Sequence, residues 1–216
     1  MNKDSICLNI GSGLVSPDGW KNIDNSPTLK ISKIPLIGQL LISVVGGPPW
    51  PKSVNNGDIV KGLKISKGSC ENIFASHVLE HLSLSDFHLA MSNIYSYLKP
   101  GGIFRAIVPD LEQYIDNYIN HRSDSTLSAK AAHEFIETSW LGHPGKRSSI
   151  YYRLQEAFSN SRHQWMWDEP SLKNAFAQHG FKNIRRCNYG DWSDARFSAV
   201  DQESRYLNAI SIEGTK

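Results

Sequence analysis

A short apolar stretch that ends in glycine decides the fold: CLNIGSG, residues 7–13. An apolar run of this length, closed by glycines, predicts a buried strand over residues 6–10 followed by a tight turn. Glycine tolerates a left-handed backbone and has no side chain, so Gly11 and Gly13 allow another group to approach the turn closely. The stretch therefore predicts a ligand site at the end of the first strand.

Strands and helices alternate along the rest of the chain. The apolar patterns predict strands over residues 21–24, 72–76, 103–108 and 206–212, and one that begins near residue 181. Helices are expected from the Ser83 cap to the stop at Pro100, from residue 111 onward, and over residues 171–179. Such alternation predicts an α/β fold with a mostly parallel sheet and helices on both faces.

Several polar or glycine positions fall where predicted strands end. They are Gly11 to Gly13, Asp24, the Ser76–His77 pair and the Pro109–Asp110 pair. In open α/β sheets, ligands bind beyond the carboxyl ends of the strands. We therefore expect these residues to share one edge of the sheet and to line the site.

Composition excludes several classes of partner. The 216 residues carry a net charge of only +2, which predicts no nucleic-acid surface. The three cysteines are scattered and the first residues contain no secretory signal, so we expect a protein of the reducing cytoplasm. The apolar segment 31–47 is too short and too interrupted to span a membrane.

Segment 31–47 has apolar residues at helical spacing. They are Leu36, Ile37, Leu40, Leu41, Val44 and Val45. The leading interpretation is a helix that packs on the body of the domain. The alternatives are a lid over the site or a face that touches lipid or a lipid-linked substrate.

The motifs together resemble the class I S-adenosylmethionine-dependent methyltransferases, and most closely a small bacterial-type group associated with surface-polysaccharide modification. The resemblance covers LNIGSG, GWKNID, NGDIV, ENIFASHVLEHL and LKPGGIFRAIVPDLE in the first 115 residues, with HQWMWDEPSLKNAFAQHGF further on. It implies a Rossmann-like fold in a single domain, residues 1–216. About 1–115 would bind the cofactor, a helical region over about 120–168 would face the acceptor, and a helix and strands would follow over about 169–213.

The resemblance also implies roles for particular residues. Asn9, Gly11, Ser12 and Gly13 would lie against the methionine part and ribose of S-adenosylmethionine. Asp24 would hold the ribose hydroxyls, Asp58 would accept from the adenine amino group, and Ser76 and His77 would line the floor near the sulfonium. Asn9 departs from the family pattern, which has an acid there. The chain also leaves almost no room for a helix between the first two strands.

A hydroxyl acceptor needs a general base, and His81, Asp110 and His163 are the candidates. Each has a structural alternative: His81 as a helix cap or packing residue, Asp110 as the N-cap of the next helix, and His163 as a rim residue bonded to backbone. The resemblance favours a sugar hydroxyl of a polysaccharide, or of its nucleotide- or lipid-linked precursor, over a small aromatic or quinone-like hydroxyl. Trp140, Trp165 and Trp167 are sugar platforms or core residues.

Three other functions compete with methyl transfer. Residues 77–81, HVLEH, match the H-x-x-E-H motif of zinc peptidases, for which Glu156 would complete the ligands. A divalent ion at Glu80 and His81 that assists methyl transfer is a related alternative, but we expect no metal. A nicotinamide enzyme fits the sheet but not the glycine spacing. A non-catalytic relative that binds a cofactor or a partner fits the departure at Asn9.

Overall fold

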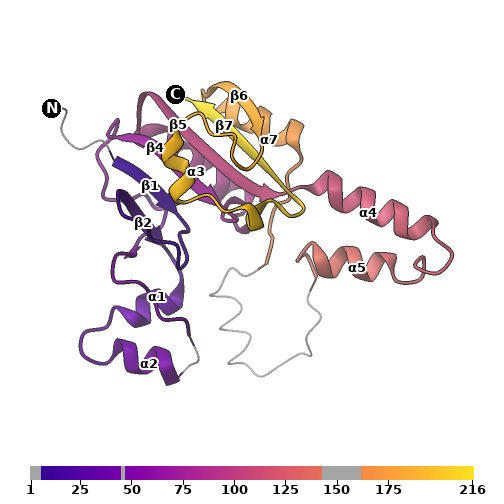
Figure 1. The fold of residues 1–216 in the computed structure, drawn as a ribbon, viewed down its shortest axis with the longest axis horizontal. Helices are drawn as coiled ribbons and strands as arrows, with labels where there is room; N and C mark the ends of the chain where they lie inside the picture. The colour runs from indigo at the N-terminus through magenta and orange to yellow at the C-terminus, as the bar shows by residue number, and fades with distance from the viewer. Residues whose placement is uncertain (1–5, 45–46, 143–161) are drawn as a thin grey trace.

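The computed structural model describes residues 6–44, 47–142 and 162–216 (Figure 1). Within these residues, seven strands form one sheet in the order β3-β2-β1-β4-β5-β7-β6. All pairings are parallel except those of β7, which runs antiparallel to β5 and β6. The expected α/β fold with a mostly parallel sheet is confirmed. The strands are β1 (Ile6–Ile10), β2 (Trp20–Asp24), β3 (Asn55–Asn56), β4 (Cys70–Ser76), β5 (Leu98–Pro109), β6 (Lys182–Cys187) and β7 (Ala209–Thr215).

One face of the sheet is covered by α3 (Leu84–Tyr97) and α7 (Glu169–Gln178). Ser83 caps α3 as expected, because its hydroxyl accepts a hydrogen bond from the backbone N–H of Asp86 at 3.2 Å. The helices pack their apolar faces on alternate residues of the strands. The resulting core includes Leu8, Ile73, Phe87, Met91, Phe104, Leu172 and Phe176.

Within the described residues, the other face is covered by two 3₁₀ helices, η2 (Ala195–Ala199) and η3 (Glu203–Tyr206), so helices lie on both faces as expected. Phe197 is fully buried there against Trp20 and Phe74. Residue 206, which was predicted to begin the last strand, lies at the end of η3 instead. The last strand begins at Ala209.

A buried ion-pair network joins β5 and β7 to the segment that carries η2 and η3. The guanidinium of Arg105 is completely buried and lies 2.6 Å from Glu213 and 3.1 Å from Asp201. It also donates to the backbone oxygen of Asn188 and to the hydroxyl of Tyr206. These contacts hold the 188–206 segment on the sheet.

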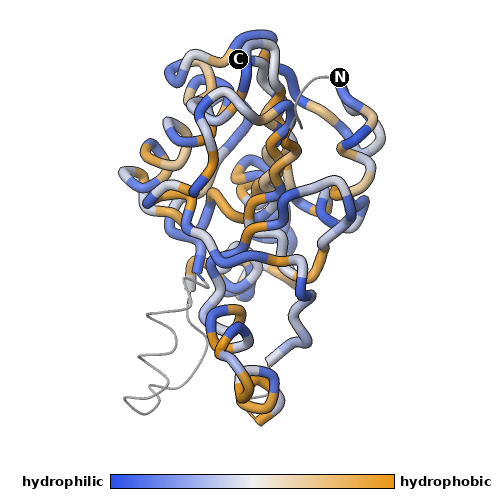
Figure 2. The backbone as a smooth tube through the Cα atoms, turned by 90° about the vertical axis from the view of Figure 1, so that its left-hand side faces the viewer, coloured by the Kyte–Doolittle hydropathy of each residue, from blue (hydrophilic) through white to orange (hydrophobic). Residues whose placement is uncertain are grey.

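Two helical hairpins project from the sheet in Figure 1: α4 (Leu111–Ser123) with α5 (Ala131–Thr138), and α1 (Pro27–Ser32) with α2 (Gly38–Val44). The second hairpin contradicts the expected single helix packed on the body. The segment breaks into two short helices on either side of Pro35, and Leu36, Leu40 and Val44 are largely exposed. Figure 2 shows the hydrophobic residues of this segment at one tip of the molecule. Val45 lies outside the described residues.

Two further features bear on the sequence predictions. No helix intervenes between β1 and β2, as the short spacing indicates. The proline- and glycine-rich connection after α2 contributes the two-residue edge strand β3. Among the described residues, no helix is both long and apolar enough to cross a membrane.

Candidate functional site

The glycine turn after β1 adopts the conformation that its sequence indicates. Gly11 has φ +63° and Gly13 has φ +55°, both in the left-handed region. A Cβ at Gly11 would lie 2.2 Å from Cγ2 of Val78, so this glycine admits the loop after β4. A Cβ at Gly13 would meet no atom within 4 Å. Gly13 is thus the position at which the turn borders open space.

Asn9 and Ser12 are buried and hold the turn in place. Asn9 Nδ2 donates to the backbone oxygen of Val15 at 3.2 Å and to Oδ1 of Asn22 at 3.1 Å. The backbone N–H of Ser12 donates to the backbone oxygen of Ile23 at 3.1 Å. Asn9 therefore uses its amide group to fix the backbone of the turn.

Asp24 is the last residue of β2, and Asp58 lies just past β3 at the same edge of the sheet. Asp24 accepts from the backbone N–H of Gly13 at 2.9 Å and of Ser26 at 2.7 Å. Asp58, just past β3, accepts from the backbone N–H of Val60 at 3.0 Å. Each carboxylate oxygen has a second lone pair, so both residues retain acceptor capacity for a ligand.

The HVLEH segment forms a turn at the end of β4 and no α-helix. Ser76 ends the strand, and its buried hydroxyl has no hydrogen-bond partner among the described residues. His77 has φ +54°, an uncommon backbone for a residue with a side chain. Leu79–His81 then form the 3₁₀ helix η1. The helical arrangement of the two histidines typical of zinc peptidases is therefore absent.

This turn places the carboxylate of Glu80 between two imidazoles. Glu80 is completely buried. Its Oε1 lies 3.2 Å from Nδ1 of His77 and 4.0 Å from Nε2 of His81. Its Oε2 has no hydrogen-bond partner among the described residues. A buried carboxylate with so few partners is costly, which marks this cluster as a candidate site.

Backbone contacts indicate which nitrogens of the histidines carry protons. His77 Nε2 lies 3.0 Å from the backbone oxygen of Arg205, and His77 Nδ1 lies 3.2 Å from Glu80, so the protonated ring donates to an acceptor at each nitrogen. His81 Nδ1 lies 3.1 Å from the backbone oxygen of Arg162 and therefore donates to it. This tautomer leaves Nε2 of His81 as the nitrogen with a lone pair.

The pKa values of two neighbouring histidines move in opposite directions. Burial disfavours the charged form of His77, but the Glu80 carboxylate and the Arg205 carbonyl outweigh it, so the pKa of His77 is raised above 6.5. Burial lowers the pKa of His163 below 6.5, although Glu80 opposes this shift. The surroundings thus stabilise the charged form of His77 and destabilise the charged form of His163.

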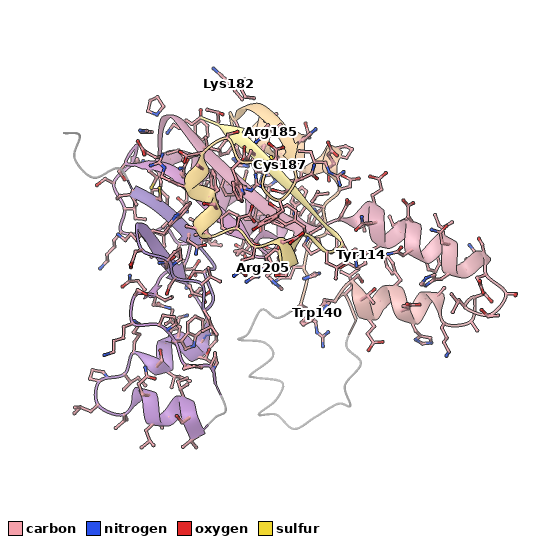
Figure 3. The ribbon with its side chains drawn as sticks, in the orientation of Figure 1. Tyr114, Trp140, Lys182, Arg185, Cys187 and Arg205 are labelled. Carbon is pink, nitrogen blue, oxygen red and sulfur yellow. The ribbon has the colours of Figure 1, made fainter. Side chains whose placement is uncertain are left out.

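A pocket of about 290 Å³ opens beside this cluster. It is lined by His77, Glu80, His81, Pro109, Tyr114, Trp140 and His163. The ring of His163 lies 5.1 Å from that of His81 and stacks at 6.2 Å on Trp140. Tyr114 comes from the first turn of α4 and Trp140 follows α5, so the projecting hairpin supplies one wall (Figure 3).

Asp110 is the N-cap of α4, which is the structural role that the sequence analysis offered as the alternative to a general base. Its Oδ1 accepts from the backbone N–H of Glu112 at 3.1 Å, which makes it the N-cap of α4, and Oδ2 lies 3.7 Å from Arg186. It does not line the pocket that contains His81 and His163. The structure therefore brings two of the three candidate bases together.

The three candidate tryptophans have different positions. Trp140 lines the pocket and is half exposed. Trp167 is buried, with its ring 4.4 Å from that of Phe87 in the core. Trp165 is exposed beside Trp167. Only Trp140 is placed as a platform for a ligand.

Tyr114 is a pocket residue that the sequence analysis did not identify, since it had only the spacing of a helix face. Burial raises the pKa of its hydroxyl, and the Glu80 charge adds to the effect. The available signal was its position five residues after the end of β5, at the edge where ligands bind.

One cluster within the described residues fits a metal ion. A donor atom each of Glu80, His81 and His163 lies within 4.8 Å of the others. Two histidines and a carboxylate are a ligand set used for zinc and iron. Glu156 lies outside the described residues.

Comparisons with known proteins agree with this architecture. The model of a family described as a methyltransferase domain matches residues 22–186. No curated protein sequence matches the chain. The fold is similar to a SAM-dependent methyltransferase of Thermotoga maritima, with TM-score 0.51 and 13% identity over 100% of this chain and 84% of that one. It is equally similar, at 14% identity with the same TM-score and coverage, to a chain in the complex of the Haloferax volcanii Trm112 methyltransferase activator with a protein described as a methyltransferase.

Proposed function

Because this chain belongs to the methyltransferase domain family, for which S-adenosylmethionine is the methyl donor, we propose that it methylates a hydroxyl group held in the pocket beside Glu80. The observation that carries this proposal is the environment of His81. Its Nδ1–H is fixed on the Arg162 carbonyl, so Nε2 is left as a proton acceptor close to Glu80. A hydroxyl acceptor requires such a base, whereas a tertiary amine acceptor does not.

The edge of the sheet fits the cofactor. Gly13 has open space where a Cβ would stand, and the buried hydroxyl of Ser76 has no partner in the described part of the chain. Gly11 to Gly13, with Asn9 behind them, would border the methionine part and ribose. Asp24 would accept from the ribose hydroxyls, Asp58 from the adenine amino group, and Ser76 and His77 would form the floor. When bound, the sulfonium supplies an activated methyl group.

The residues of this chain then align the acceptor and remove its proton. His81 Nε2 takes the proton as the hydroxyl oxygen forms its bond to the methyl carbon. Glu80 stabilises the imidazolium that results, since its carboxylate is 4.0 Å away and buried. His163, neutral because burial lowers its pKa, is the second candidate base, and Asp110 remains the least favoured of the three.

The acceptor that we propose is a sugar hydroxyl of a polysaccharide or its precursor. Support comes from the pocket wall, where the half-exposed ring of Trp140 stands beside the polar groups of Tyr114 and His163. Sugars bind by stacking their C–H faces on such rings while polar groups accept from their hydroxyls. A small aromatic or quinone-like hydroxyl is the runner-up, because it stacks on the same ring.

A substitution at His81 tests this function. We expect His81→Ala to lower kcat for S-adenosylhomocysteine formation by about 10²–10⁴-fold, since a general base contributes this much. The acceptor panel contains nucleotide sugars, free glycosides and substituted phenols. Affinity for S-adenosylhomocysteine, measured by calorimetry, should remain unchanged because His81 lies on the acceptor side.

The matched control is His133→Ala, since His133 is exposed on α5 and does not line the pocket. Its kcat should equal that of the wild type. Full turnover in His81→Ala would remove this residue from the mechanism. If only phenols in the panel are methylated, the acceptor is a small aromatic hydroxyl and not a sugar hydroxyl.

A divalent cation is a second candidate occupant of the cluster. The observation that favours it is the unpartnered Oε2 of Glu80 beside two imidazoles with donor atoms within 4.8 Å. A cation there would lower the pKa of a coordinated hydroxyl, and His81 would be a ligand instead of a base. Chelation distinguishes the two roles. Activity that survives dialysis against EDTA supports the base, and activity restored by added Zn²⁺ or Mn²⁺ supports the cation.

A further inference from the structure

The α1–α2 hairpin presents a surface that the proposed chemistry does not use. We propose that this hairpin docks the protein on an anionic lipid bilayer. The inference rests on the fold and exposed apolar residues of segments 27–44 and 47–54 and on the charge of this part of the sequence. It does not depend on the identity of the methyl acceptor.

The hairpin is stabilised by a small hydrophobic core of its own. Leu29, Trp50 and Val54 are buried against one another, apart from the two cores of the sheet. The indole N–H of Trp50 donates to the hydroxyl of Thr28 at 3.1 Å. Gly38 lets α2 meet α1 closely, because a Cβ there would lie 2.6 Å from two backbone oxygens of α1. These contacts therefore hold together the backbone of the two helices that carry the outward side chains.

The outer surface of this hairpin is apolar. Leu36 is fully exposed, Val44 is 76% exposed and Leu40 is 67% exposed. The exposed apolar residues of the segment are Ile34, Leu36, Ile37, Leu40, Leu41 and Val44. Figure 2 shows that the hydrophobic residues of this hairpin lie at one tip of the molecule, away from the sheet. Apolar residues that gather at one projecting tip mark an interaction site.

The charge of the segment identifies the partner. Residues 25–57 contain Lys30, Lys33 and Lys52 and no acidic residue, a net charge of +3 in a chain of +2. All three lysines are exposed. Exposed leucines and isoleucines flanked by lysines are the combination that binds the interface of anionic membranes. A second copy of the chain is disfavoured, since the same cationic surface would meet itself.

The hairpin is also placed where docking affects the site. It leaves the sheet at the carboxyl end of β2, the edge at which β4 and β5 lead into the pocket. Docking through residues 34–44 would hold this edge close to the lipid surface.

Vesicle flotation of the full chain tests the proposal. We expect the protein to float with vesicles of phosphatidylglycerol and phosphatidylcholine in equal parts, and to float less with pure phosphatidylcholine or at high salt. Leu36→Ser with Leu40→Ser should lower the partition coefficient about tenfold or more. Replacement of Lys30, Lys33 and Lys52 by glutamine should lower it by about fivefold per lysine.

The matched control is Leu89→Ser, because Leu89 is 54% exposed on α3 and lies outside the hairpin. This variant should float as the wild type does. All variants should keep their circular dichroism spectra, since each loses an exposed side chain. A wild type that does not float would overturn the proposal, as would Leu36→Ser/Leu40→Ser that floats unchanged. Dimerisation in solution that these substitutions abolish, without vesicle binding, would assign the surface to a second copy.

Discussion

Gly11 and Gly13 share a left-handed backbone but differ in what surrounds them. A side chain at Gly11 would overlap Val78, whereas one at Gly13 would enter open space. We expect Gly11→Ala to lower the free energy of unfolding by about 2–5 kcal/mol, from left-handed strain plus overpacking. Gly13→Ala should cost only about 1–2 kcal/mol, from strain alone. Urea denaturation of the two variants measures the difference.

A double variant separates the two causes at Gly11. Adding Val78→Ala removes the overlapping methyl groups, so the double variant should lose less stability than the sum of the single variants. Additive losses would mean that the contact with Val78 is not what requires glycine.

His77 and His163 line one pocket and should titrate on opposite sides of 6.5. The charge on Glu80 holds the proton on His77, and burial excludes it from His163. NMR titration of the imidazole nitrogens measures both midpoints. In Glu80→Gln, we expect the midpoint of His77 to fall. A midpoint for His77 below 6.5 in the wild type would show that Glu80 does not hold its proton.

The shift at His77 also has a consequence for stability. The folded pKa lies above the unfolded value, so the folded state binds the proton more tightly. The stabilisation from this pair is fully present below pH 6.5 and is lost as the pH rises through the raised pKa.

At the level of elements, Arg105 holds the segment with η2 and η3 (residues 188–206) on strands β5 and β7. Removing this guanidinium leaves Asp201 buried without its cation and takes one of the two cations from Glu213, which keeps its pair with Arg185 at 2.8 Å. We expect Arg105→Met to lower the free energy of unfolding by about 3–5 kcal/mol, the usual cost of breaking a buried pair. Chemical denaturation at neutral pH gives this value.

Arg196→Met is the control, because Arg196 also pairs with acids, Glu71 and Asp194, but is 46% exposed. Exposed pairs contribute about 0–1 kcal/mol. Equal losses in the two variants would contradict the special role of the Arg105 network.

The strands were predictable because their sequence pattern is local. The apolar runs of β1, β4 and β5 and the Ser83 cap each carry their own signal within a few residues. The exposure of residues 34–44 was not predictable from periodicity, since a helix that faces a core and one that faces a partner have the same spacing. The position of Pro35 and Gly38 was the local signal for two short helices.

The site was predictable where it follows strand ends and unpredictable where it depends on distant contacts. Gly13 and Asp24 meet at the expected edge. The partners of Arg105 could not be inferred, because Glu213 is 108 residues away. The same holds for His81, whose tautomer is set by the Arg162 carbonyl from another part of the chain.

At the scale of the whole molecule, different parts of the chain are proposed to bind the cofactor and the acceptor. We propose that residues 1–216 form a single domain, in which about 1–115 hold the cofactor. The region over about 120–168 shapes the acceptor side, and residues 169–213 complete the sheet. The described part of this arrangement supports the division, since Tyr114 and Trp140 reach the pocket from the α4–α5 hairpin.

The central claim is that the edge formed by Gly13 and Asp24 binds S-adenosylmethionine, and calorimetric titration with S-adenosylhomocysteine tests it most directly. We expect saturable binding to the wild type at one site per chain. The affinity of Asp24→Ala for S-adenosylhomocysteine should be lower by about tenfold or more, because hydrogen bonds to a charged carboxylate are lost. The fold of this variant should be retained. Equal affinity of Asp24→Ala and wild type, or no binding by a folded wild type, would contradict the account.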